Sequence, residues 1–239
     1  MRKRWAPWRR WSLGIGGGLL ALVGAYAGWA YMTGNVHTVV AGELYRSATL
    51  SSGRLRDVIE SRGIRTIINL RGRAENSAWY RDEARVAGEA DVRLIDLRWS
   101  ARRGLTDEEV ATYFQVLADA PRPILIHCFS GADRSGLAAA LYLAQIKKAG
   151  ELTAEFQLSL LFGHISLPFA PFYAMDETFE RLEPWLGYEG ELRRSGRLGG
   201  RLGGRRGGAA HGWHRAMAFC GRVASDPKGG SPARNTSAA

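Results

Sequence analysis

Two reactive side chains lie close together in the middle of the chain: Cys128 and Arg134 enclose five residues. A cysteine thiolate is a strong nucleophile, and an arginine guanidinium can donate two parallel N–H bonds to the oxygens of a phosphate group. His127 precedes the pair and Ser135 follows it, and a serine hydroxyl can donate a hydrogen bond to sulfur. The spacing therefore predicts attack on phosphorus, with Cys128 as the nucleophile and Arg134 as a phosphate ligand.

The residues around this pair predict a cradle for an anion. Residues 123–126 form a short apolar run typical of a buried strand, and residues 137–148 form a helical run that Gly150 would end. A tight loop before a helix N-terminus directs its N–H groups toward an anion, and the same field stabilises a thiolate. We expect Ser135 to assist the sulfur as a leaving group and His127 to orient the loop through backbone contacts. The expected phosphate-binding residues are Phe129, Ser130, Gly131, Ala132, Asp133 and Arg134.

Residues 127–136 resemble the signature of the cysteine-dependent protein tyrosine and dual-specificity phosphatases. Residues 137–143 also resemble the helix that follows this signature in bacterial members, and the resemblance extends from Val39 to about Gly187. It implies an α/β fold and cleavage of a phosphomonoester through a phosphocysteine intermediate, which water then hydrolyses. It also implies that neither a metal nor a cofactor takes part.

Cleavage of a phosphate ester requires a proton donor for the leaving oxygen, and two aspartates are candidates. Asp96 ends an alternating strand, and its spacing before Cys128 resembles that of the general acid in dual-specificity phosphatases. Asp133 lies inside the loop, where some bacterial relatives use an aspartate before the arginine. Asp96 is favoured. The structural alternatives are an ordinary strand-end carboxylate for Asp96, and for Asp133 a brace for Arg134 or for a backbone amide.

The substrate is less well defined by the sequence. Phosphotyrosine or another phosphoprotein is the first expectation, and a phospholipid or a glycan phosphate is the alternative. Ala132 stands where some phosphoinositide-directed bacterial relatives carry lysine, which weakens the case for an inositol lipid. Arg71 and Arg73 either flank the pocket or lie in solvent, and Trp99 either forms a pocket wall or packs within its own loop.

Two other classes of function also fit part of the pattern. Rhodanese-type sulfur transferases place a cysteine before an arginine, but the upstream histidine, the five-residue spacing and Asp96 argue against them. A membrane-tethered binder of phosphorylated ligands would keep the loop without turning over a substrate. The presence of Cys128, Arg134 and a candidate acid favours an enzyme over such a binder.

The net charge of +10 comes from the two ends of the chain. Residues 1–11 carry five basic and no acidic groups, and residues 187–239 carry ten basic and three acidic groups. The residues between them hold 18 basic and 20 acidic groups, a net charge of −2. Because the catalytic region is not basic, we expect no nucleic acid as a partner.

The N-terminal residues predict a membrane anchor. A basic flank, residues 1–11, precedes a predicted transmembrane helix over residues 12–33, whose apolar core is long enough to cross a bilayer. Aromatic residues at both ends suit the interfaces, and the basic flank would stay in the cytoplasm. We therefore expect a single-pass protein with a periplasmic catalytic domain. A cleaved signal peptide is the alternative, because Ala25-Tyr26-Ala27 resembles a cleavage site.

Residues 36–187 predict one α/β phosphatase domain with a central, mostly parallel sheet flanked by helices. Thr106 and Glu109 predict a capping box at a helix start. The active site is expected at the carboxyl ends of the strands. Strands are predicted within residues 36–45, 64–70, 92–97 and 123–126, and helices over 50–61, 76–88, 107–118, 155–161 and 174–186.

The C-terminal residues differ in character from the predicted domain. Residues 188–239 are rich in glycine and arginine and cannot bury enough apolar surface to fold, so we expect a disordered tail. Cys220 lies in this tail. A disulfide between it and Cys128 would abolish catalysis, so we expect neither cysteine to be structural.

Overall fold

The computed structural model describes residues 17–18, 24–26, 28 and 32–188. Most of the predicted transmembrane segment, residues 12–33, lies outside these residues, as does the predicted tail from residue 189 onward. Among the residues that are described, no helix is both long enough and apolar enough to cross a membrane.

The described residues fall into two compact units. Residues 106–120 belong to the second unit and contain helix α4 (Asp107–Asp119). Its start confirms the predicted capping box: the Thr106 hydroxyl accepts a hydrogen bond from the Glu109 backbone N–H, and the Glu109 carboxylate accepts one from the Thr106 N–H. All the other elements belong to the first unit.

The first unit contains a five-stranded sheet with the order β1-β2-β5-β3-β4. Only β1 is antiparallel to its neighbour, and the other pairs are parallel, which confirms the predicted mostly parallel sheet. Isoleucine and leucine side chains of β3 and β5 are almost fully buried, as central strands covered on both faces require. The strands are β1 (His37–Val40), β2 (Leu44–Ser47), β3 (Thr66–Asn69), β4 (Arg93–Asp96) and β5 (Ile124–His127).

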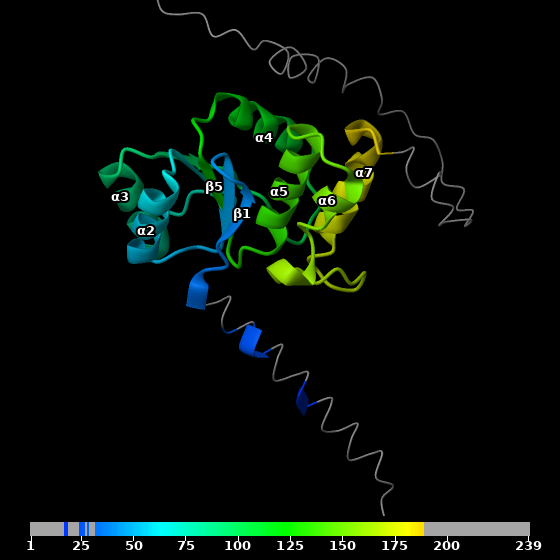
Figure 1. Cartoon of the computed structure of the whole chain (residues 1–239), viewed down its shortest axis with the longest axis horizontal. Coiled ribbons are helices and arrows are strands. Elements are labelled where there is room, and N and C mark those ends of the chain that lie inside the picture. Colours follow the sequence, from blue (N-terminus) through cyan, green and yellow to red (C-terminus); the bar gives the residue numbers. More distant parts are fainter. Residues whose placement is uncertain (1–16, 19–23, 27, 29–31, 189–239) are drawn as a thin grey trace, which may run out of the picture. The chain divides into compact units, whose positions relative to one another are not determined.

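Helices cover both faces of this sheet (Figure 1). On one face lie α2 (Ser52–Arg62), which ends at the left-handed Gly63, and α3 (Ala78–Glu89). On the other lie α5 (Asp133–Gln145), α6 (Glu151–Glu155) and α7 (Ala174–Leu186). The predicted helix over residues 174–186 is thereby confirmed.

Two helix predictions near the loop were wrong. Helix α5 begins at Asp133 instead of residue 137, so the end of the anion loop forms its first turn. It ends before Gly150, because Lys148 takes the left-handed conformation and Gly150 becomes the N-cap of α6. The helix predicted over residues 155–161 is absent. The short α6 ends at the first residue of that range, and a single 3-10 turn, η1 (Leu160–Phe162), begins near its end.

The carboxyl ends of the parallel strands are aligned. Ser47 of β2 and Asn69 of β3 both pair in register with His127 of β5, and Asp96 of β4 pairs with Asn69. The residues after these strands therefore meet at one edge of the sheet, where parallel α/β sheets bind their ligands.

Candidate active site

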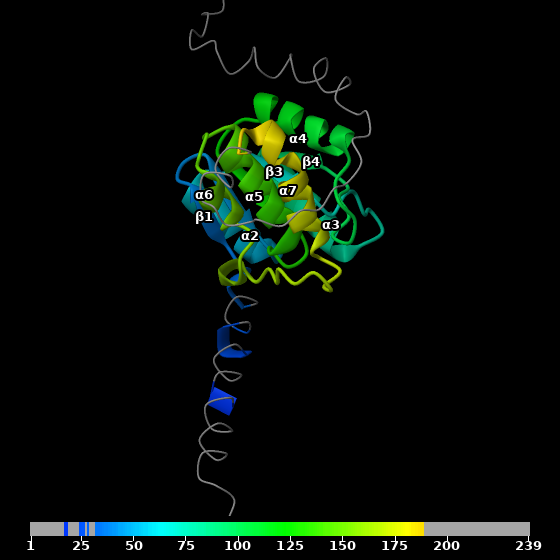
Figure 2. The same cartoon turned by 90° about the vertical axis from the view of Figure 1, so that its right-hand side faces the viewer.

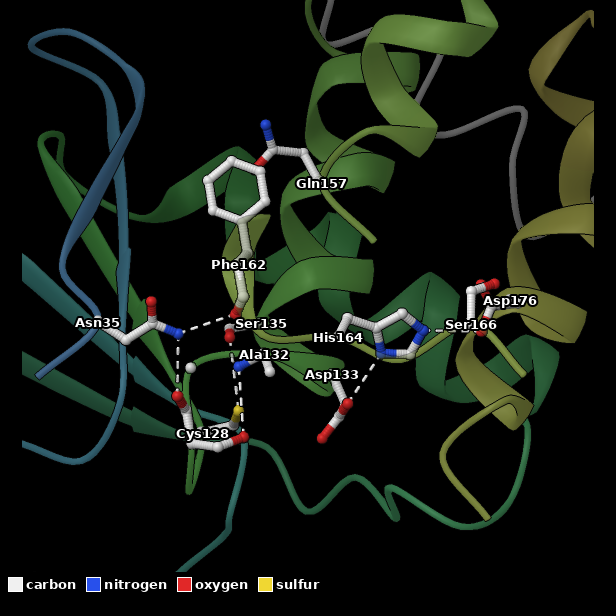
Figure 3. Close-up of polar contacts among 12 residues, drawn as sticks. Asn35, Cys128, Ala132, Asp133, Ser135, Gln157, Phe162, His164, Ser166 and Asp176 are labelled. Carbon is white, nitrogen blue, oxygen red and sulfur yellow. Dashed lines mark hydrogen bonds and ion pairs between the residues drawn. The ribbon is translucent and has the colours of Figure 1, made fainter. Parts of the chain in front are cut away.

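The loop after β5, residues 128–132, turns all five of its carbonyl groups away from its centre. Thr49 bonds to the first two carbonyl oxygens, Asn35 to the third (Figure 3) and Arg46 to the last two, at donor–acceptor distances of 2.8–3.3 Å. In a planar trans peptide the N–H points opposite to the C=O. The N–H groups that follow these carbonyls therefore point toward the inside of the loop, as an anion cradle requires, although the Ala132 N–H also donates to the Ser130 hydroxyl at 3.4 Å.

Gly131 allows the loop to close tightly. Its φ of +75° lies in the left-handed region, and a Cβ atom there would come within 2.6 Å of the Ala48 backbone nitrogen. A side chain at this position is thus opposed both by the backbone conformation and by the neighbouring strand end.

Replacement of Gly131 by alanine is expected to disable the loop. The left-handed conformation alone costs about 1–2 kcal/mol for a residue with a Cβ atom, and the contact with Ala48 displaces the loop as well. We expect a large loss of kcat together with a lower midpoint of urea unfolding. Gly42 is the matched control, because its φ is +74° but nothing lies within 4 Å of an added Cβ. A Gly131→Ala variant with the kcat of Gly42→Ala would contradict this account.

Cys128 and Ser135 face each other at the N-terminus of α5 (Figure 3). Both residues are buried, and the Cys128 Sγ lies 3.4 Å from the Ser135 Oγ. The positive end of the helix dipole and a hydroxyl in reach of the sulfur both stabilise negative charge there. The arrangement has the parts that a nucleophilic thiolate needs.

Arg134 reaches across the mouth of the cradle. One terminal nitrogen donates to the carbonyl oxygens of Leu70 (3.3 Å) and Trp99 (3.2 Å). The Nε is buried and has no hydrogen-bond partner among the described residues. The Arg134 guanidinium thus keeps an N–H donor that no described residue uses, and such a donor can bond to a phosphate oxygen.

Arg46 is a buried cation beneath the loop that the sequence analysis missed. It is fully buried, and besides the two loop carbonyls it donates to the backbone and side-chain oxygens of Gln157 at 2.7 and 3.0 Å. Burial lowers its pKa to about 10, while charge on Cys128 and Asp133 opposes the change, so it remains charged at neutral pH. The sequence carries no local signal for this role, because the burial of Arg46 follows from the place of β2 inside the sheet.

His127 supports the loop from the side of the sheet that carries α3. Its side chain is buried, and its Nε2 lies 2.6 Å from Oε1 of the buried Glu83. The two atoms are close, but their geometry is not that of a hydrogen bond. The His127 carbonyl accepts from the Leu70 N–H at 3.0 Å. Glu83 was not among the predicted site residues.

Asp96 lies at the same edge of the sheet, and both of its carboxylate oxygens are engaged. Asn69 Nδ2 donates to one oxygen at 2.7 Å, and the Tyr80 hydroxyl donates to the other at 2.5 Å. Burial and the hydrogen bond to Asp96 raise the pKa of Tyr80 to about 12. The contacts orient the Asp96 carboxylate firmly. Neither partner was predicted.

Asp133 contacts a buried histidine that was not predicted (Figure 3). His164 Nδ1 lies 2.8 Å from the Asp133 carboxylate, and Nε2 lies 2.8 Å from the carboxylate of Asp176 on α7. Ser166 donates to the other oxygen of Asp176. Burial opposes a charge on His164, but the hydrogen bonds to the two aspartates outweigh it and raise its pKa to about 9. The imidazole is therefore charged at neutral pH and holds Asp133 in place.

The pKa of His164 predicts a pH dependence of stability. It is raised from 6.5 to about 9 on folding, so the folded chain binds this proton more tightly than the unfolded chain. The stabilisation that protonated His164 adds to the folded chain is present in full below pH 6.5, and it is lost as the pH rises through 9. We expect the free energy of unfolding to fall by up to about 3 kcal/mol across this interval. Urea titrations should show a much smaller fall for His164→Asn, and equal falls would contradict the assignment.

The remaining predicted residues divide between the site and the solvent. Arg71 lies beside the loop: it stacks on Trp79 at 3.5 Å and lies 5.2 Å from the ring of the exposed Phe129. Arg73 is exposed and pairs with a neighbouring glutamate. The Trp99 side chain is buried, and the contact with Arg134 is made by its carbonyl group. Within the described part of the chain, no cluster of three or more possible metal ligands occurs.

Comparisons with known proteins agree with this geometry. The sequence profile of the tyrosine phosphatase family matches residues 23–155, which is more than half of the chain. A crystal structure of TpbA from P. aeruginosa is similar at 25% identity and a TM-score of 0.50, over 62% of this chain and 84% of that one. A TpbA variant in complex with phosphotyrosine has 22% identity and a TM-score of 0.49, over 64% and 91%.

A third similar structure is the catalytic core of the PP-IP phosphatase SIW14 from S. cerevisiae, in complex with citrate. It has 19% identity and a TM-score of 0.47, over 65% of this chain and 94% of that one. No curated protein matches the chain.

Proposed function

Because the chain belongs to the tyrosine phosphatase family, we propose that it hydrolyses phosphomonoesters through a phosphocysteine on Cys128. The observation that carries the proposal is the position of this buried thiol. It lies at the N-terminus of α5, inside a loop whose five carbonyl groups point outward, and Arg134 in the first turn of the same helix has an unpartnered Nε. Hydrolysis of p-nitrophenyl phosphate by the purified chain, inhibited by vanadate, is the first test.

In the first step, the Cys128 thiolate attacks phosphorus and the bond to the ester oxygen breaks. The phosphoryl group moves to sulfur, and the leaving oxygen takes a proton from a general acid. The loop N–H groups and the Nε of Arg134 hold the three remaining phosphate oxygens during the transfer. The positive charge of Arg46 beneath the loop favours binding of the phosphate anion.

In the second step, water attacks the phosphocysteine, and phosphate and the Cys128 thiolate are released. Ser135 stabilises the departing sulfur through a hydrogen bond over the 3.4 Å between the two atoms. Asp133 is within the loop, and it accepts a charge-assisted hydrogen bond from His164. We assign Asp133 to accept the proton of the attacking water.

Asp96 is proposed as the general acid of the first step. It ends β4 at the edge of the sheet that carries the loop, and Asn69 and Tyr80 orient its carboxylate. Asp96→Asn is expected to lower kcat about 100-fold for a substrate with a poor leaving group, such as phenyl phosphate. The same variant should lose little with p-nitrophenyl phosphate, whose leaving group needs no proton. Equal losses of kcat with both substrates would show that another residue is the general acid. Asp133→Asn, assayed with the same two substrates, is the matched comparison.

Phosphotyrosine in a protein is the first substrate class that we propose, and a phospholipid or glycan phosphate is the second. Phe129 is 69% exposed beside the half-buried Arg71, and this pair supplies an aromatic face and a cation at the mouth of the site. Both groups suit an aryl phosphate. Substrate trapping with Cys128→Ser in membranes, followed by identification of the bound molecule, separates a protein from a lipid or a glycan.

We also propose that the chain is anchored by residues 12–33 with its catalytic domain in the periplasm, because the apolar run follows a basic flank. The size of the mature protein tests this: loss of the N-terminal residues would indicate a cleaved signal peptide instead. Two other classes of function have their own tests. A chain that binds phosphate but does not hydrolyse p-nitrophenyl phosphate would be a membrane-tethered binder. Turnover of thiosulfate would indicate a rhodanese-type sulfur transferase.

A further inference from the structure

The segment between α6 and α7 has an apolar outer surface. Residues 156–175 contain no aspartate, glutamate, lysine or arginine, although 23% of the chain is charged. Several large apolar side chains of this segment are exposed by 37–85%. Exposed apolar residues normally occur singly, and a group of them indicates a contact surface. We call this group the apolar strip: Leu160, Leu161, Ile165, Leu167, Phe169 and Phe172.

The inner side of the same segment is firmly held by polar contacts. The Phe162 carbonyl accepts from Asn35 Nδ2 at 3.0 Å, and the same amide nitrogen donates to the carbonyl of Ser130 in the catalytic loop (Figure 3). His164 bonds to Asp133 and Asp176 on the same side. The segment is thus fixed to the catalytic loop, and the exposure of its outer side is not the result of a loose attachment.

The strip also contacts the apolar N-terminal run. The hydroxyl of Tyr26, which lies within the uncharged run Leu13–Met32, donates to the carbonyl of Leu161. In both views the segment between α6 and α7 lies at the edge of the unit where the residues before β1 leave it (Figures 1 and 2).

We propose that the apolar strip is a membrane-docking surface that lies in the interface of the bilayer entered by residues 12–33. Its content of leucine, isoleucine and phenylalanine without charge suits insertion of side chains between lipid headgroups. Interfacial elements reach about 5–10 Å into the boundary between headgroups and acyl chains.

A lipid surface fits this strip better than the tail of the chain. Residues 187–239 carry a net charge of +7 and are rich in glycine, so they offer little apolar surface to cover leucine and phenylalanine side chains. The proposal rests on the proposed membrane anchor of residues 12–33, but it does not depend on the catalytic function. Because Asn35 and His164 join the strip to the catalytic loop, docking would set the height of the active site above the bilayer.

The test uses the full chain in vesicles of phosphatidylcholine and phosphatidylglycerol. In a chain with both cysteines replaced by serine, Phe169→Cys carries a nitroxide label, and Ile146→Cys provides the matched control. Both positions are exposed, by 85% and 40%, so neither substitution opens the core. Collision rates of the label with oxygen, which dissolves in lipid, and with a water-soluble nickel chelate are measured by electron paramagnetic resonance.

We expect the oxygen-to-nickel ratio at residue 169 to exceed that at residue 146 several-fold. Equal ratios at the two positions would overturn the proposal, as would a chain that fails to associate with the vesicles. A label at residue 169 that is shielded from both reagents and broadened by a second label would show a second copy on the strip instead. None of these results depends on catalysis, so the docking surface and the phosphatase mechanism fail separately.

Discussion

Replacement of Cys128 by serine is expected to lower kcat for p-nitrophenyl phosphate by a factor of about 10⁴ or more, as removal of a catalytic nucleophile does. A serine hydroxyl is not ionised at neutral pH, and neither the dipole of α5 nor Ser135 can supply a base for it. The substitution conserves volume in a buried position, so the fold and the phosphate cradle are retained. Stopped assays of product formation measure the loss.

The matched control for this variant is Cys220→Ser, the same substitution at the other cysteine of the chain. It should leave kcat unchanged. Binding of inorganic phosphate or vanadate to Cys128→Ser should persist, because the loop N–H groups and Arg134 remain. A serine variant that retains more than a few per cent of the activity would show that another group attacks phosphorus.

Replacement of Arg134 by lysine is expected to lower kcat by a factor of about 10³, although the charge is conserved. A lysine ammonium cannot reproduce the planar fork of N–H donors, and it cannot at the same time hold the carbonyl groups of Leu70 and Trp99. The loss should appear in kcat/KM for every phosphomonoester, because the arginine holds the group that is transferred.

Arg73→Lys provides the matched control. Arg73 is exposed and pairs with Glu75 outside the site, so the same change there should have no effect on turnover. An Arg134→Lys variant within tenfold of the parent would mean that the unpartnered Nε does not contact the phosphate. The role assigned to this nitrogen would then be wrong.

The sequence predicts the local parts of this site well. Residues 124–135 form a strand, a loop and a helix start that are contiguous in the chain. The mostly parallel sheet could be predicted because short apolar strand segments alternate along the chain with segments of helical spacing. Even so, the start of α5 was misplaced, because Asp133 and Arg134 are polar and do not extend the apolar helical pattern.

Long-range partners could not be predicted in the same way. Arg46 bonds to Gly131 and Ala132, which lie 85 and 86 positions away, and His164 bonds to Asp133, which lies 31 positions away. Nothing in the local pattern of residues states which buried polar side chain will meet which other. Such pairs depend on tertiary packing, and each is satisfied only when two distant elements come together.

The most direct test of the account is detection of the phosphoryl group on sulfur. The chain is mixed with ³²P-labelled p-nitrophenyl phosphate, denatured within milliseconds in neutral detergent and digested, and the labelled peptide is identified by mass spectrometry. We predict one labelled peptide, with phosphate on Cys128, and no label in Cys128→Ser. A label on another residue would contradict the mechanism. Full turnover without any labelled peptide, which would indicate direct transfer of the phosphoryl group to water, would contradict it as well.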